Sequence, residues 1–102
     1  MFARNATYQM KSNQGHDFAS KFQKDVLPIL RSAPGFRDEI TLLSSSNESV
    51  GITLWDTRDQ HDAYVKNLDV QVLKLLEPMT SGAPTVRTYE VSSSTAHKLP
   101  VA

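Results

Sequence analysis

Two hydrophobic periodicities alternate along this chain, and their order restricts the fold more than any other feature of the sequence. Four segments have the alternation, or the β-branched and aromatic content, of half-buried strands: residues 2–11, 36–44, 49–55 and 85–91. Residues 16–32 instead carry apolar side chains at helical spacing, and a second helical stretch, read as one helix or a helix pair, extends from Thr57 through Leu76. The order is that of the α+β, ferredoxin-like βαββαβ fold.

This fold predicts one four-stranded antiparallel sheet with both helical segments on the same face. The domain is expected to cover residues 1–91, followed by a polar C-terminal tail over residues 92–102. The opposite sheet face has no cover, and neither face is expected to be purely polar. Alternation places Phe36, Ile40, Leu42, Val50, Ile52 and Leu54 on one face, and Leu43 and Trp55 on the other. Because monomers rarely expose an apolar patch of several hundred Å², we expect a homodimer in which two sheets pack face to face.

Three local signals refine the helices. Pro28 lacks a backbone donor, so it is expected to kink the last turn of the first helix or to begin a short final segment. The sequence Thr57-Arg58-Asp59-Gln60 has the form of a capping box, which predicts the start of the next helix. Asp69 is expected to cap a further helical segment.

Composition excludes several classes of function. Eleven basic and eleven acidic residues cancel, so no net charge favours nucleic acid or an anionic membrane surface. Cysteine is absent, and no glycine-rich phosphate loop or Gly-x-Ser-x-Gly sequence occurs. No apolar run approaches the roughly 18 residues of a membrane-spanning helix, and the N-terminus lacks the features of a signal peptide. A cytoplasmic protein is therefore expected.

Five pieces of sequence resemble the antibiotic biosynthesis monooxygenase-like family of dimeric α+β barrel proteins. They are Leu27-Pro28-Ile29-Leu30, Pro34-Gly35-Phe36, a strand that ends at Trp55, Tyr64, and Tyr89-Glu90-Val91. The resemblance implies a ferredoxin-like protomer, a dimeric barrel of two sheets, and a pocket between sheet and helices. Several members of the family oxidise polycyclic aromatic compounds with molecular oxygen and without metal or flavin, which implies that no cofactor is needed.

Other members of that family degrade haem, and here the sequence departs from their pattern. Those members carry a tryptophan at the position of Tyr64 and a haem-ligating histidine about ten residues further on. This chain has Lys74 there, and no histidine lies between residues 62 and 96. The departure argues against haem degradation and leaves oxygenase or ligand-binding activity open.

Four residues are candidates for catalytic roles. Asn5 lies on the polar side of the first strand, where the resemblance implies a functional asparagine in some members. The alternative interpretation is that its amide is simply exposed to solvent. Trp55 closes the third strand and could stack on an aromatic ligand or simply pack the corner. Tyr64 lies on the inner stripe of the second helical stretch. His61 could transfer protons at a pocket mouth, because histidine changes protonation near neutral pH, or could be a surface residue.

A second group is expected to line the substrate pocket: Tyr8, Phe18, Phe22 and Tyr89. Each has an alternative as a packing residue in the core. No histidine spacing typical of metal sites occurs, so no metal ligands are expected. Arg4 is expected at the sheet rim or across a dimer seam rather than facing a ligand.

Two functions follow from these residues. The first is a cofactor-independent monooxygenase that acts on a small aromatic or quinol-like compound. The alternative is a non-catalytic homodimer that binds a small ligand or serves in assembly. A pocket lined by Asn5, Trp55 and Tyr64 would favour the enzyme, whereas a space filled by apolar core residues would favour the alternative.

Overall fold

A computed structural model describes residues 1–11 and 15–99 of the chain. Four antiparallel strands form one open sheet in the order β2-β3-β1-β4: β1 (Phe2–Gln9), β2 (Phe36–Leu43), β3 (Glu48–Trp55) and β4 (Thr85–Glu90). The helices are α1 (Gly15–Lys21), α2 (Leu27–Ser32), α3 (Arg58–Asn67) and α4 (Asp69–Leu76). The element order and strand order are those of a ferredoxin-like α+β fold, which confirms the predicted fold class.

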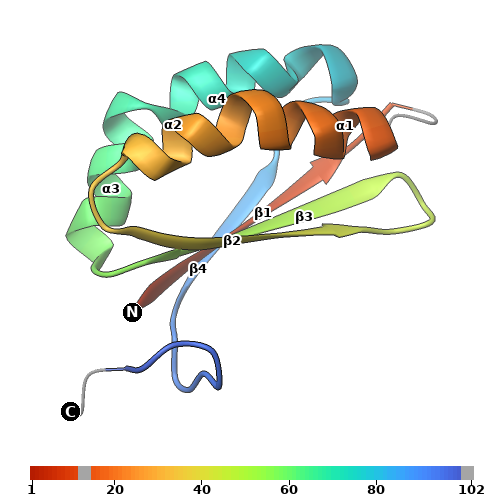
Figure 1. Cartoon of the computed structure of the whole chain (residues 1–102). Helices are drawn as coiled ribbons and strands as arrows, with labels where there is room; N and C mark the ends of the chain where they lie inside the picture. Colours follow the sequence, from red (N-terminus) through yellow and green to blue (C-terminus); the bar gives the residue numbers. More distant parts are fainter. Residues whose placement is uncertain (12–14, 100–102) are drawn as a thin grey trace.

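The helices all lie on one face of the sheet, and the other face is open (Figure 1). None of the helices among residues 1–11 and 15–99 has the length and apolar content needed to cross a membrane. Residues 12–14, and residues 100–102 of the expected tail, lie outside the described residues.

The first helical stretch contains a π-helical turn at Phe22–Val26 between α1 and α2. Pro28 stands in the first turn of α2, directly after this π-helical turn. This position confirms the expectation that Pro28 begins a short final segment. The buried side of the stretch is formed by Phe18, Phe22, Val26 and Leu30.

A β-bulge between Phe36 and Asp38 corrects the predicted orientation of Phe36. The extra residue, Arg37, reverses the alternation, so Phe36 turns toward the helices and packs edge-on against Trp55 at 5.6 Å between ring centroids. Ile40 shares a face with Ile52, its partner on β3, as predicted, and this is the open face. Alternation alone could not reveal the bulge, because one inserted residue leaves no compositional mark.

The start of α3 follows its predicted signal, and the start of α4 does not. The hydroxyl of Thr57 accepts a hydrogen bond from the backbone N–H of Gln60 at 3.2 Å. Asp69 begins α4, but it makes no capping bond there. Its carboxylate turns inward instead, and the expectation that Asp69 caps this segment is wrong.

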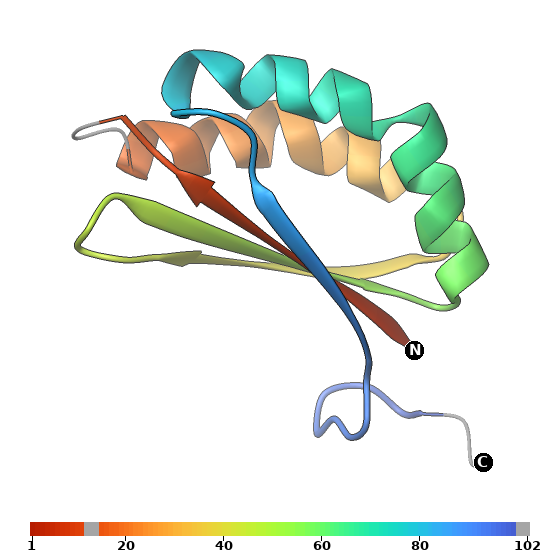
Figure 2. The same cartoon turned by 180° about the vertical axis from the view of Figure 1, so that it is seen from behind.

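The open face carries a continuous apolar area on β2 and β3. Ile40 and Leu42 are close to half exposed, and they pair with Ile52 and Val50 of the next strand. Residues 91–99 leave β4 at the end of the sheet away from the cover of the helices (Figure 2). His97 in this segment lies 3.0 Å from a carboxylate oxygen of Asp38 on β2.

Candidate functional site

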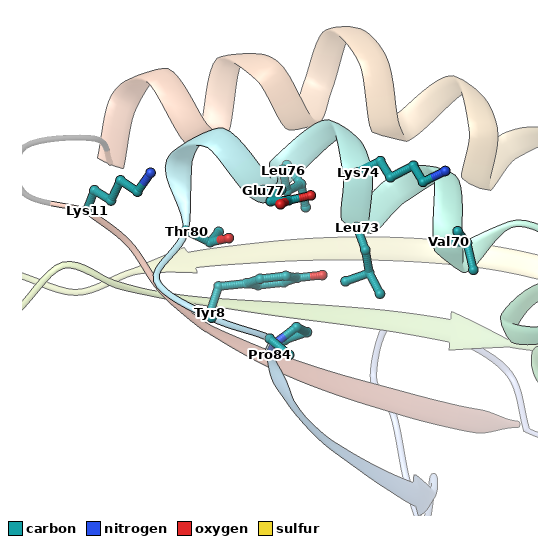
Figure 3. A pocket seen from close by; sticks show the side chains of 11 residues that line it. Tyr8, Lys11, Val70, Leu73, Lys74, Leu76, Glu77, Thr80 and Pro84 are labelled. Atoms are coloured by element: carbon teal, nitrogen blue, oxygen red, sulfur yellow. The ribbon is translucent and has the colours of Figure 1, made fainter.

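An open cavity of about 530 Å³ lies beside the last turn of α4, and we call it the outer cavity (Figure 3). Its walls come from the end of β1, from α4 and the turn after it, and from the segment that leads into β4. They are formed by Tyr8, Lys11, Val70, Leu73, Lys74, Leu76, Glu77, Thr80, Gly82, Ala83 and Pro84. Its volume lies within the range of cavities that bind small organic ligands.

Tyr8 places an aromatic ring along this cavity, with its hydroxyl directed toward Leu73 (Figure 3). The residue is buried because it belongs to the helix-facing side of β1, where it packs against Phe18 at 5.4 Å between ring centroids. Lys11 and Lys74 bring positive charge to the cavity, and Glu77 brings one negative charge. The cavity therefore combines an apolar wall, a phenol and two cations.

Behind Tyr8 lies a buried ion pair between Arg4 and Asp69. The Arg4 guanidinium donates to one carboxylate oxygen of Asp69 at 3.2 Å, and the hydroxyl of Tyr64 donates to the other at 3.1 Å. The expectation that Arg4 lies at the sheet rim is wrong, because strand alternation turns its side chain toward the helices and leaves the residue 7% exposed. The pair satisfies two charges that would otherwise be costly to bury.

Aromatic side chains surround this pair on the side of β3. Trp55 is fully buried and lies 4.9 Å from Tyr64 between ring centroids. Its indole N–H donates to the hydroxyl of Thr53 at 2.9 Å. His61 is also buried, with one ring nitrogen 2.9 Å from Asp62 and the other without a hydrogen-bond partner among the described residues, so the expectation of a surface histidine does not apply.

A second, much smaller cavity of about 20 Å³ lies between the sheet and the helices, and we call it the inner cavity. Its walls include the ion pair and Tyr64, and its other residues are Ala6, Tyr8, Phe22, Val26, Leu30, Gly51, Thr53 and Val72. Tyr8 lines both cavities, so its phenol lies at the boundary between them. A space of this size holds one water-sized group.

Burial raises the pKa of the Tyr8 phenol to about 12, with a further contribution from the negative charge of Asp69, which Arg4 partly offsets. Burial also raises the pKa of Tyr64, again with Asp69 as the second cause. Both phenols therefore stay protonated near neutral pH. Tyr8 can donate a hydrogen bond to a ligand there and does not act as a base.

The raised pKa of Tyr8 predicts a loss of stability in alkaline solution. An unfolded tyrosine releases its proton near pH 10, whereas folded Tyr8 keeps its proton up to about pH 12. Its contribution is thus complete below about pH 10 and is lost as the pH rises through this interval. Between roughly pH 9 and pH 11, we expect denaturant-measured stability to fall by about 1 kcal/mol more in the wild type than in Tyr8→Phe. Equal pH dependence in the two proteins would contradict the assignment.

The structure brings only some of the predicted site residues together. Tyr8 lines the outer cavity, and Tyr64 lies behind it. Trp55 contacts Tyr64 without lining either cavity. Asn5 lies on the open face opposite Ile52, because odd-numbered residues of β1 point away from the helices, and it does not reach either cavity.

The remaining predicted residues also divide between faces and layers. Tyr89 lies on the exposed edge strand β4, opposite Ala3, and lines neither cavity. Phe18 is a core residue that is 1% exposed. Phe22 lines the inner cavity. His61 packs against Phe2 at 5.0 Å between ring centroids and does not line either cavity.

Sequence reasoning missed two parts of the site. The pairing of Arg4 with Asp69 joins positions 65 residues apart, so no local pattern could reveal it. The sequence analysis noted Lys74 only because it stands where haem-degrading members have a histidine. Its position next to Leu73 on α4 could have indicated that a charged side chain lines the cavity.

Among residues 1–11 and 15–99, no three histidine or carboxylate side chains cluster closely enough to hold a metal ion.

A family model described as antibiotic biosynthesis monooxygenase matches residues 1–73 of the chain. This span includes β1, β2, β3, α3 and most of α4. It also contains both partners of the buried ion pair and the phenol of Tyr8. No curated protein matches the chain by sequence.

Solved structures share this fold at low sequence identity. A protein of unknown function from Nitrosomonas europaea, NE2512, is 16% identical over 99% of this chain and 95% of its own, with a TM-score of 0.76. The cofactor-independent oxygenase SnoaB from Streptomyces nogalater is 13% identical over 94% and 97%, with a TM-score of 0.75. The monooxygenase from the gene ActVA-Orf6 of Streptomyces coelicolor, in complex with nanaomycin D, is 16% identical over 98% and 92%, with a TM-score of 0.76.

Proposed function

Because the chain belongs to the antibiotic biosynthesis monooxygenase family, we propose that it is a cofactor-independent monooxygenase for a small aromatic or quinol-like compound. The observation that carries this proposal is the outer cavity, which presents the protonated phenol of Tyr8 and two lysines to a space of about 530 Å³. The substrate ring lies against the apolar wall around Leu73 and Leu76. Its oxygen atom points toward Tyr8.

The reaction uses the electrons of the substrate itself. A substrate of the anthrone type loses a proton to become an electron-rich anion, which Lys11 or Lys74 and the Tyr8 hydroxyl stabilise. The anion transfers electrons to dioxygen and forms a carbon–oxygen bond. One oxygen atom stays as a new carbonyl group, and the other leaves as water with two substrate hydrogens. The chain contributes binding and charge stabilisation.

The two named oxygenases of similar fold support this chemistry. SnoaB is described as a cofactor-independent oxygenase, and the ActVA-Orf6 protein was solved with nanaomycin D. Trp55 and Tyr64 are proposed as positioning residues, because Tyr64 holds Asp69 and Trp55 packs against Tyr64. Asn5 and His61 have no contact with the outer cavity and are not given a role in this reaction.

We also propose that the active form is a homodimer joined through the open faces of the two sheets. The supporting observation is the apolar area formed by Ile40, Leu42, Val50, Ile52 and Leu54. Pairing these areas would bury apolar surface, and each Å² buried would stabilise the dimer by roughly 25 cal/mol. It would also enclose Asn5, whose amide accepts a hydrogen bond from Thr7 on the same face.

Oxygen uptake tests the proposed reaction. We expect the wild type to accelerate oxygen consumption by anthrone or a substituted hydroquinone, whereas Leu73→Trp, which fills the outer cavity, loses at least about 90% of the enhancement. Gln71→Trp, which adds the same bulk on the exposed side of α4, should keep it. Asn5→Ala should also keep the enhancement, because Asn5 does not line the outer cavity. A loss of the enhancement in this variant would place the reaction on the open face. Uptake equal to a protein-free blank across the panel would contradict the oxygenase proposal.

A specific observation favours the alternative of a non-catalytic ligand-binding protein. The space between sheet and helices is filled by Phe18, Phe22, Val26, Leu30 and Leu76, which surround the small inner cavity. Under this alternative, the same aromatic compounds bind in the outer cavity without oxygen uptake. Leu73→Trp would then weaken binding, and no product would form.

A further inference from the structure

The end of the chain that follows β4, residues 91–99, lies on the open side of the sheet, and we call it the tail segment. It begins where the backbone N–H of Val91 donates to the carbonyl oxygen of Met1 at 2.9 Å, and it then runs below the sheet, away from the helices (Figure 1). Its far end reaches β2, because Nε2 of His97 lies 3.0 Å from a carboxylate oxygen of Asp38. Since β4 and β2 are the two outer strands, the tail segment spans the width of the sheet.

The contact between His97 and Asp38 is made on the open face. Asp38 pairs with Leu54 of β3, and side chains of cross-strand partners point to the same face. Leu54 alternates with Trp55, which is buried against the helices, so Leu54 and Asp38 both point to the open face. The His97 side chain is 23% exposed, and its backbone N–H donates to the hydroxyl of Ser94 at 2.9 Å. The tail segment therefore approaches Asp38 in an ordered turn.

This position of the tail segment is incompatible with a second sheet at the same place. Two sheets that pack face to face lie about 10 Å apart, and side chains fill the space between them. A backbone segment whose side chain directly contacts Asp38 occupies that space or the layer of the second sheet itself. The proposed dimer needs the same space, because its contact area includes Leu54, the partner of Asp38 on β3. The tail segment and a second copy of the chain therefore compete for this end of the open face.

We propose that the tail segment is a clip, closed over the open face by His97 and Asp38, which opens when two protomers join. The inference rests on the proposed homodimer, which supplies the second occupant of the face. A partly exposed ion pair contributes little stability, so the clip can open without unfolding the sheet. Because each dimer requires two open clips, the dissociation constant changes by the square of the effect of one contact. The clip thus sets the protein concentration at which dimers form.

The sign of one substitution tests the competition. His97→Ala should lower the dimer dissociation constant by about three- to tenfold in sedimentation experiments, because two weak contacts no longer oppose association. Lys98→Ala changes the exposed neighbouring residue and should leave the constant within about twofold of the wild type. In an Asp38→Ala background, His97→Ala should have no further effect, because its partner is already absent. An unchanged constant in His97→Ala, a weaker dimer, or an equal effect in both backgrounds would overturn the proposal.

Cross-linking locates the tail segment in the single protomer. The chain has no cysteine, so Asp38→Cys combined with His97→Cys supplies the only two thiols. In dilute solution, a short bismaleimide should join these thiols within one chain. The matched control combines Leu42→Cys with His97→Cys: Leu42 lies on the same face of β2, four residues and about 13 Å further along, and should not be joined. Equal linking of the two pairs, or no linking of either, would overturn the clip.

The two measurements separate this inference from the proposed dimer. If the wild type stays a single protomer at every concentration while the first pair is linked, the homodimer is contradicted, and the opening of the clip with it. If the wild type forms a dimer whose dissociation constant does not respond to His97→Ala, the clip alone is contradicted.

Discussion

Asp69→Asn is expected to lower the free energy of unfolding by about 3–5 kcal/mol, the largest effect of any single substitution considered. The change leaves the Arg4 guanidinium in a buried position without its carboxylate partner. It also weakens the acceptor that holds the hydroxyl of Tyr64 at 3.1 Å. Denaturant unfolding followed by circular dichroism measures the loss.

Two further variants separate this effect from a general loss of charge. Asp25→Asn breaks the exposed pair of Asp25 with Lys21 and should change stability by no more than about 0.5 kcal/mol. The double variant Arg4→Met with Asp69→Leu removes both charges and should recover most of the loss. If Asp69→Asn costs no more than Asp25→Asn, the ion pair does not hold the inner cavity together.

The second large effect concerns assembly. Ile52→Lys places a charge in the middle of the open face, between Ile40 and Asn5 on the flanking strands. In the proposed dimer this ammonium group would be buried without a partner, so we expect the dimer dissociation constant to rise more than about 100-fold. The folded protomer should survive, because the same lysine reaches water when the face is open. Sedimentation at several concentrations measures the change.

The control adds a lysine to the other side of the molecule. Gln71→Lys changes an exposed residue of α4 and should leave the dissociation constant within about twofold of the wild type. A wild-type protein that sediments as a monomer at micromolar concentration would contradict the dimer. So would an Ile52→Lys variant that associates as tightly as the wild type.

Most of the fold could be predicted from hydrophobic periodicity. The alternation put Tyr8 and Asn5 on opposite faces of β1 and Trp55 on the face of β3 opposite Ile52, and the structure has the same division. The capping sequence at Thr57 located the start of α3 because its signal lies within four consecutive residues. Such features are local, so a single sequence contains all the information they need.

The site was less predictable because its parts are distant in sequence. Arg4 interrupts the row of apolar residues on its face of β1. Its charge can be buried because Asp69 of α4 accepts a hydrogen bond from the guanidinium. The shape of the outer cavity depends on the path of the segment that connects α4 to β4. This segment, which includes Pro84, has no hydrophobic periodicity from which its path could be predicted. Tyr8 was predicted as a pocket residue, with core packing as the alternative, and its place between two cavities follows from three-dimensional packing.

The most direct test of the proposed reaction is mass spectrometry of the product formed from anthrone under isotopically heavy dioxygen. We expect one heavy oxygen atom in each product molecule, and we expect the wild type and Gln71→Trp, but not Leu73→Trp, to accelerate its formation. Product that forms at the same rate without protein, or equally well after the outer cavity is filled, would contradict oxygenation beside Tyr8.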